Sequence, residues 1–200
     1  MNTTLAVPEI SPLVLQMSPA IEMTDEQFFD FCQQNRDYRI ERTAKGEVII
    51  MSPTGSETGN RNFDLIFQLG LWTRQNKTGI GFDSSTGFTL PNGSIKSSDA
   101  AWIRLEKWHN LTPEQQQKFA PICPDFVVEL RSPSDNLKRL QDKLQDYIEQ
   151  GTLLGWLIDR KHQQVYIYRP NQPVGCLTQP TTLSEESVLP GFVLDLSTIW

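Results

Sequence analysis

Hydrophobic and polar residues follow two different periods along the chain, and the period changes several times. Apolar residues recur at helical spacing in residues 57–75 and again in residues 137–150, which predicts two amphipathic helices. Capping-box patterns at Thr24 to Gln27 and at Thr112 to Gln115 predict the starts of two further helices. Segments rich in β-branched and aromatic residues predict strands at residues 38–41, 47–51, 79–82, 86–90, 95–103, 125–130, 153–158 and 164–168.

The order of these elements predicts the fold class. An N-terminal helix and a β-hairpin precede the long helix, after which strands and helices alternate, so we expect an α/β (α+β) fold with a central mixed β-sheet flanked by helices. Residues 1–22 are interrupted by prolines and are predicted to form a flexible N-terminal arm. Residues 23–200 have the length of a single domain. The apolar residues 188–200 are expected to pack back on its core.

Composition excludes several classes of protein. Five tryptophans, ten phenylalanines and four tyrosines argue against a disordered chain. No stretch approaches 18 uninterrupted apolar residues, so no membrane span is expected. Three widely spaced cysteines suit a reducing cytoplasm better than a disulfide framework. With two histidines and no Cys-x-x-Cys pattern, a bound metal would be a hard cation on carboxylate oxygens rather than zinc.

The net charge of −6 is unevenly distributed. The 24 acidic residues include five in residues 1–30 and three in residues 171–200, where no lysine or arginine occurs. The remaining 16 acidic residues lie in residues 31–170, together with all 18 basic residues. The acidity of the chain therefore does not exclude DNA as a partner, although it favours weak, salt-sensitive and metal-dependent binding.

Asp99, Glu129 and Lys143 are the candidate reactive residues. Asp99 and Glu129 lie in predicted strands, where a carboxylate is costly unless it is paired or ligates a cation. Two converging carboxylates could hold one Mg²⁺ or Mn²⁺ with water in the remaining positions. Lys143 lies at the edge of the apolar stripe of its helix, from which it could lean toward the end of the Glu129 strand. This set suits phosphodiester hydrolysis; the alternatives are structural carboxylates and a surface lysine with a buried stem.

Four blocks of the sequence carry a resemblance to a known family: residues 46–55 (GEVIIMSPTG), 98–102 (SDAAW), 123–135 (CPDFVVELRSPSD) and 143–159, which ends in LGWLID. Over these blocks the chain resembles the Uma-type restriction endonuclease family of the PD-(D/E)xK nuclease superfamily. The resemblance implies a restriction-endonuclease-like core and divalent-metal-dependent cleavage of DNA. It also implies that Asp99 and Glu129 are the two motif acids and the metal ligands.

The sequence departs from the family pattern at two motif positions. Ser98 precedes Asp99 where the motif has proline, and Arg131 stands two residues after Glu129 where the motif has lysine. An arginine stays protonated and cannot accept a proton, although it can clamp a phosphate. Lys143 matches the lysine that some superfamily members carry on the following helix, and we favour it over Arg131.

Two further acids have alternative interpretations. Asp125 precedes Glu129 on the same strand face and is expected to be a strand-start or supporting residue rather than a ligand. Glu57 resembles the extra helical acid that many such nucleases contribute, but an acid near a helix N-terminus is also favoured by the helix dipole.

The resulting hypothesis is a DNA endonuclease with Mg²⁺ or Mn²⁺ at Asp99 and Glu129. Its candidate catalytic residues are Asp99, Glu129, Lys143, Glu57 and Arg131. The alternative is a nuclease-fold DNA-binding or regulatory module without robust cleavage. A homodimer is a further expectation, since cutting both strands of a duplex needs two centres and the apolar C-terminal segment could pair.

Overall fold

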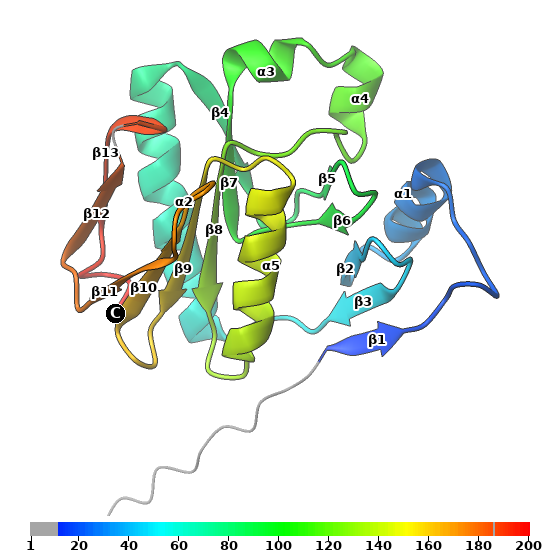
Figure 1. The fold of residues 1–200 in the computed structure, drawn as a ribbon, viewed down its shortest axis with the longest axis horizontal. Coiled ribbons are helices and arrows are strands. Elements are labelled where there is room, and N and C mark those ends of the chain that lie inside the picture. The colour runs from blue at the N-terminus through cyan, green and yellow to red at the C-terminus, as the bar shows by residue number, and fades with distance from the viewer. Residues whose placement is uncertain (1–11, 186) are drawn as a thin grey trace, which may run out of the picture.

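The computed structural model describes residues 12–185 and 187–200 as a layered α/β structure (Figure 1). The helices are α1 (Asp25–Gln34), α2 (Ser56–Asn76), α3 (Leu105–His109), α4 (Pro113–Gln117) and α5 (Leu137–Glu149). The strands are β1 (Leu13–Leu15), β2 (Arg39–Arg42), β3 (Val48–Met51), β4 (Gly79–Asp83), β5 (Phe88–Thr89), β6 (Ile95–Lys96), β7 (Ala100–Arg104), β8 (Phe126–Arg131), β9 (Leu154–Asp159), β10 (Gln164–Tyr168), β11 (Gly175–Thr178), β12 (Thr182–Glu185) and β13 (Leu189–Asp195). Both predicted capping boxes, at the starts of α1 and α4, are present.

A six-stranded sheet in the order β11-β10-β9-β8-β7-β4 forms the centre of the molecule. Its β8 and β9 are parallel and its other pairs are antiparallel, so the predicted mixed sheet is confirmed. Helix α2 and strand β13 cover one face, where Leu69 of α2 belongs to the same buried cluster as Val128 of β8 (Figure 1). Helix α5 covers the other face, where Leu144 belongs to the same cluster as Val127.

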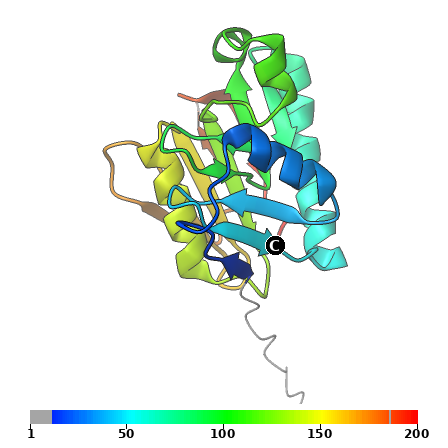
Figure 2. The same ribbon diagram turned by 90° about the vertical axis from the view of Figure 1, so that its right-hand side faces the viewer.

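A second sheet, in the order β1-β3-β2-β6-β5, is built around the predicted N-terminal hairpin. It packs against α1 through Phe28, Val48 and Ile95, which are almost fully buried (Figure 2). Lys96 of β6 forms an ion pair with Asp146 of α5, which joins this sheet to the helix of the central sheet.

The segment predicted as one strand over residues 95–103 is two strands in two different sheets. β6 ends at Lys96 in the hairpin sheet, and β7 begins at Ala100 in the central sheet. Ser97, Ser98 and Asp99 cross between them, and we call these three residues the crossing segment. Both serines are buried. The crossing segment brings the hairpin to the end of the central strands where Asp99 lies.

Other expectations need correction. Part of the predicted flexible arm is ordered, because Leu13–Leu15 pair with β3 as strand β1, whereas residues 1–11 lie outside the described part of the chain. The apolar residues that predict α2 are Phe63, Ile66, Phe67 and Leu71. Of these, Ile66 packs against the core and the other three are exposed, while the fully buried apolar residues of the helix are Leu65, Leu69 and Trp72. The predicted helix is confirmed, although most of the residues that predict it lie outside its buried face.

The C-terminal segment packs on the core as expected. Leu189, Phe192 and Leu194 of β13 are buried within the protomer, so these side chains are not available for the pairing between copies suggested from the sequence. None of the helices in residues 12–185 and 187–200 combines the length and the apolarity that crossing a bilayer needs.

Candidate active site

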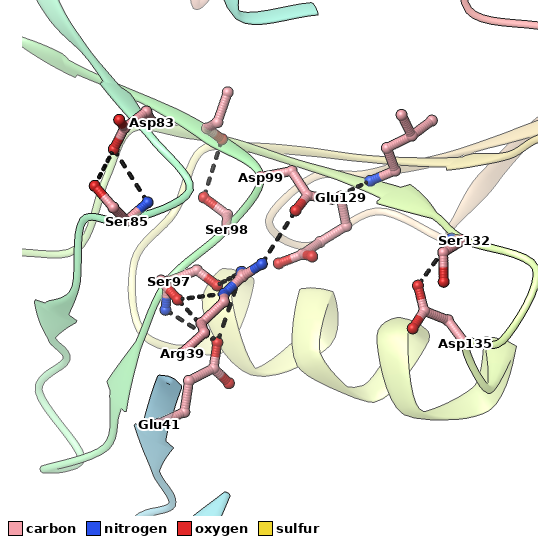
Figure 3. A network of polar contacts seen from close by, with 12 residues as sticks. Arg39, Glu41, Asp83, Ser85, Ser97, Ser98, Asp99, Glu129, Ser132 and Asp135 are labelled. Atoms are coloured by element: carbon pink, nitrogen blue, oxygen red, sulfur yellow. Dashed lines mark hydrogen bonds and ion pairs between the residues drawn. The ribbon is translucent and has the colours of Figure 1, made fainter. Parts of the chain in front are cut away.

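Asp99 and Glu129 lie next to one another on the α5 face of the central sheet. Asp99 donates its backbone N–H to Val128 O (3.1 Å), and its Oδ2 accepts the N–H of Leu130 (2.7 Å). These two hydrogen bonds contact β8 on either side of Glu129, which fixes the Asp99 carboxylate beside that of Glu129 (Figure 3). As whole residues, Asp99 is 7% exposed and Glu129 is 3% exposed, so both carboxylates are largely removed from water.

Glu129 is an incompletely satisfied buried carboxylate. Its Oε1 lies 2.8 Å from Nζ of Lys143, but this buried oxygen makes no hydrogen bond of normal geometry within the described structure. Burial raises the pKa of Glu129 to about 7, and the nearby charge of Asp99 adds to the increase although Lys143 and Arg39 oppose it.

Lys143 points into the site rather than toward solvent. Its side chain is 12% exposed, and Nζ donates to Glu41 Oε1 (2.9 Å) and to the Ser97 carbonyl oxygen (2.6 Å). The alternative of a surface lysine is therefore wrong, and the predicted lean toward the Glu129 strand is confirmed. Burial favours the neutral amine, but Glu129 and Glu41 outweigh it and raise the pKa of Lys143 above its usual value. The raised pKa favours the protonated ammonium form of Lys143 in this arrangement.

Sequence reasoning missed two charged residues of the site, Arg39 and Glu41 of β2. They share one face of the strand because they are two positions apart. Arg39 donates from Nη1 to Asp99 Oδ1 (3.2 Å) and from Nη2 to the Ser97 carbonyl oxygen (2.7 Å). Besides its contact with Lys143, Glu41 Oε1 accepts the Ser97 N–H (3.1 Å). Charged residues on either side of Ile40 were a visible signal, but their partners outside β2 lie at least 56 positions away in the sequence.

The five charged side chains contain one more carboxylate than cations. Arg39 and Lys143 face Glu41, Asp99 and Glu129, so the fully ionised cluster carries a charge of about −1. Burial alone would raise the pKa of Glu41, but Lys143 and Arg39 lower it, which leaves Glu129 as the member that holds a proton most readily.

One additional positive charge would balance this cluster. The incompletely satisfied Glu129 oxygen and the excess carboxylate fit a hard cation at Asp99 and Glu129. Among the described residues, no group of three or more His, Cys, Asp or Glu side chains could hold a metal ion. A magnesium ion here would depend on two carboxylates together with water or phosphate oxygens, a ligand set that Mg²⁺ commonly uses.

Arg131 is occupied elsewhere. It stands opposite Asp159 in the parallel pairing of β8 and β9, and its Nη1 lies 3.1 and 3.0 Å from the two carboxylate oxygens of Asp159. Both side chains are buried. The contacts therefore describe a structural ion pair that joins two central strands.

Glu57 and Asp125 also have structural partners. Glu57 is 62% exposed on its side chain and pairs with Arg61 (3.0 Å) and Arg160 (2.9 Å). Asp125 lies just before β8, at the end opposite Glu129, and accepts the backbone N–H of Arg104 at the end of β7 (2.9 Å). The structure thus brings Asp99, Glu129 and Lys143 together, whereas the contacts of Glu57 and Asp125 are with other residues.

Comparison with known proteins agrees with this core. A family model described as "Putative restriction endonuclease" (Uma2) matches residues 25–197. The chain belongs to the Uma2 family. The match covers the hairpin, the crossing segment and the strands that carry the charged cluster. No curated protein matches the chain.

A solved structure shows the same fold. The chain is similar to a protein from Anabaena variabilis whose crystal structure is described as that of a putative nuclease belonging to DUF820. The TM-score is 0.71 and the sequence identity is 17%, with 89% of this chain and 97% of the other chain covered. The predicted nuclease-like fold is therefore confirmed.

Proposed function

We propose that this protein is a divalent-metal-dependent DNA endonuclease whose site consists of Asp99, Glu129 and Lys143. The observation that carries the proposal is the pair of hydrogen bonds between Asp99 and β8, one on either side of Glu129. They hold two buried carboxylates together beside a protonated lysine, in a cluster with one excess negative charge. The nuclease fold and the Uma2 family support the same reaction class.

Each residue has a chemical role in this proposal. Asp99 and Glu129 would hold Mg²⁺ or Mn²⁺, which supplies a water of lowered pKa and neutralises phosphate charge. Lys143 presents a fixed positive charge that stabilises the negative charge developing on the phosphate. The raised pKa of Lys143 favours this charge-stabilising role over proton acceptance. We assign no catalytic role to Glu57 or Arg131, since their charges are paired with other residues.

Cleavage of supercoiled plasmid DNA with Mg²⁺ or Mn²⁺ tests the proposal. We expect Asp99→Asn, Glu129→Gln and Lys143→Met each to lower the cleavage rate by at least about 100-fold. Lys138→Met is the matched control, because Lys138 lies on the same helix but is 75% exposed and pairs with Asp142. The Lys138→Met protein should cleave the plasmid at the wild-type rate.

Two results would oppose the proposal. Cleavage that survives Glu129→Gln would indicate a different site or a contaminating nuclease. A wild-type protein that cleaves neither supercoiled, linear nor single-stranded DNA with either metal would favour the second candidate, a nuclease-fold binding module.

One observation favours that second candidate. Arg39 and Lys143 already pair with the carboxylates, so the cluster is largely neutralised by the protein's own residues. A binding module would shift DNA in a gel without cleaving it, and Glu129→Gln would leave this binding unchanged.

A further inference from the structure

Arg39 is the part of the charged cluster most open to solvent. Its side chain is 29% exposed, compared with 12% for Lys143, 11% for Asp99 and 4% for Glu129. The Arg39 side chain is therefore the part of the cluster that a phosphate entering from water would reach first. A guanidinium is also well suited to phosphate, because it presents several N–H donors and is always charged.

The guanidinium of Arg39 contacts Ser97, Asp99 and, as an ion pair, Glu41 (Nη2 to Oε1, 3.9 Å). Nε donates to Ser97 Oγ (2.9 Å) and Nη2 donates to the Ser97 carbonyl oxygen (2.7 Å), which tethers the group to the crossing segment. Nη1 alone contacts Asp99, at 3.2 Å from Oδ1. Breaking this one contact would free Nη1 while leaving the tether to Ser97 in place.

Arg39 and a metal ion would compete for Asp99. A divalent cation at Asp99 and Glu129 would use the carboxylate that Arg39 now neutralises, and two cations on one carboxylate repel each other. The charge of Arg39 also acts on Glu129, so its effect extends over both proposed ligands.

We propose that Arg39 is an exchangeable counter-ion that becomes a phosphate-binding residue. In the metal-free protein Arg39 neutralises Asp99. When a divalent cation binds, Nη1 of Arg39 leaves Asp99 and donates to a phosphate oxygen of the DNA backbone, while Ser97 retains the rest of the guanidinium. This inference deepens the proposed function and depends on it for the identity of the substrate.

The proposal predicts effects of opposite sign on two kinds of binding. Removing the Arg39 charge should strengthen metal binding, because a competing cation is lost, and should weaken DNA binding. A residue that only supports the hairpin would weaken both or change neither. The two signs therefore separate an exchangeable counter-ion from a structural arginine.

The experiment measures Mn²⁺ binding by isothermal titration and DNA binding in Ca²⁺, which commonly supports binding without cleavage. For Arg39→Gln we expect Mn²⁺ affinity to rise on the order of tenfold. DNA affinity should fall by roughly tenfold, and the salt dependence should decrease by about one counterion. Arg39→Lys, which keeps the charge, should retain the wild-type Mn²⁺ affinity. Arg36→Gln is the control, because it removes the same charge from an exposed residue whose Nε donates to the backbone carbonyl oxygen of Gln33.

The metal measurement separates this inference from the proposed function. Arg39→Gln protein that binds Mn²⁺ no more tightly than Arg36→Gln protein would overturn the exchange. Unchanged DNA affinity in Arg39→Gln protein that binds Mn²⁺ more tightly would also overturn the proposal, because it would show that Arg39 does not bind a DNA phosphate. If the wild-type protein cleaves no DNA, the nuclease proposal fails, and an increase in Mn²⁺ affinity in Arg39→Gln would still support the counter-ion role.

Discussion

Replacing Lys143 by methionine would test how the charged cluster is held together. Methionine keeps most of the length of the side chain and removes the ammonium. Glu41 and Glu129 would then lose the cation that lies 2.9 and 2.8 Å from their Oε1 atoms. Both carboxylates are buried, so water cannot replace the lost ion pairs at low cost.

The size of the effect follows from burial. Removing one partner of a buried ion pair destabilises a protein by about 3–5 kcal/mol, because it leaves an uncompensated charge. For a domain of this length, that loss corresponds to a decrease in melting temperature of roughly 6–20 °C. Lys138→Met, the exposed control on the same helix, should change the free energy of unfolding by less than about 1 kcal/mol.

The penalty should also depend on pH. Without Lys143, burial and mutual repulsion raise the pKa values of Glu41 and Glu129 in the folded state above their unfolded values. A carboxyl group with a raised pKa favours folding while it is protonated, and that contribution is lost as the pH rises through the folded pKa. Lys143→Met should therefore be close to wild type at pH 5 and least stable relative to wild type above pH 7.

Urea unfolding of the metal-free proteins, followed by circular dichroism at pH 5 and pH 8, measures both effects. A loss below about 1 kcal/mol at pH 8 would show that the ammonium does not stabilise the cluster. A loss that is equal at the two pH values would contradict the assignment of the penalty to ionised carboxylates. Glu41→Gln combined with Lys143→Met should recover part of the stability at pH 8, because one of the two unpaired charges is removed.

Three further outcomes follow from the contacts. Asp159→Asn should lower the free energy of unfolding by about 3–5 kcal/mol in urea titrations, because it breaks the buried pair with Arg131. Glu57→Gln should leave Mn²⁺ affinity unchanged in isothermal titration, since Glu57 pairs with Arg61 and Arg160, and a tenfold loss would restore its sequence-based role as a ligand. Mg²⁺ affinity should rise between pH 6 and pH 8, because the pKa of Glu129 is about 7 and a protonated carboxyl group is a poor ligand; equal affinities would contradict this.

The sequence was sufficient to identify the residues of the central strands and of α5. Asp99 and Glu129 stood out because a carboxylate within an apolar strand requires a partner. Lys143 could be placed at the edge of its helical stripe because the helical period is regular. Both arguments are local, and the structure agrees with them for Glu129 and Lys143. Asp99 lies in the crossing segment, one residue before β7, rather than within a strand.

The contribution of the hairpin could not be predicted in the same way. Arg39 and Glu41 reach Ser97 and Lys143 only because a second sheet docks beside α5, and this docking is not encoded by local periodicity. The pairing of Arg131 with Asp159 likewise depends on the register of two parallel strands, and a different register would separate these residues. The break at Ser97 was hidden because the residues on both sides of it favour strands.

Because the crossing segment brings the hairpin to the site, the motif residues alone do not show whether a protein of this kind has the complete site. A chain beginning at residue 52 would keep Asp99, Glu129 and Lys143, and a motif search would score it as complete. It would lack Arg39 and Glu41, so Asp99 would lose its counter-ion and Lys143 would lose its ion pair with Glu41. Counting motif residues therefore overestimates how many fragments or shortened relatives can form this site. The presence of the hairpin is a better criterion for a complete site.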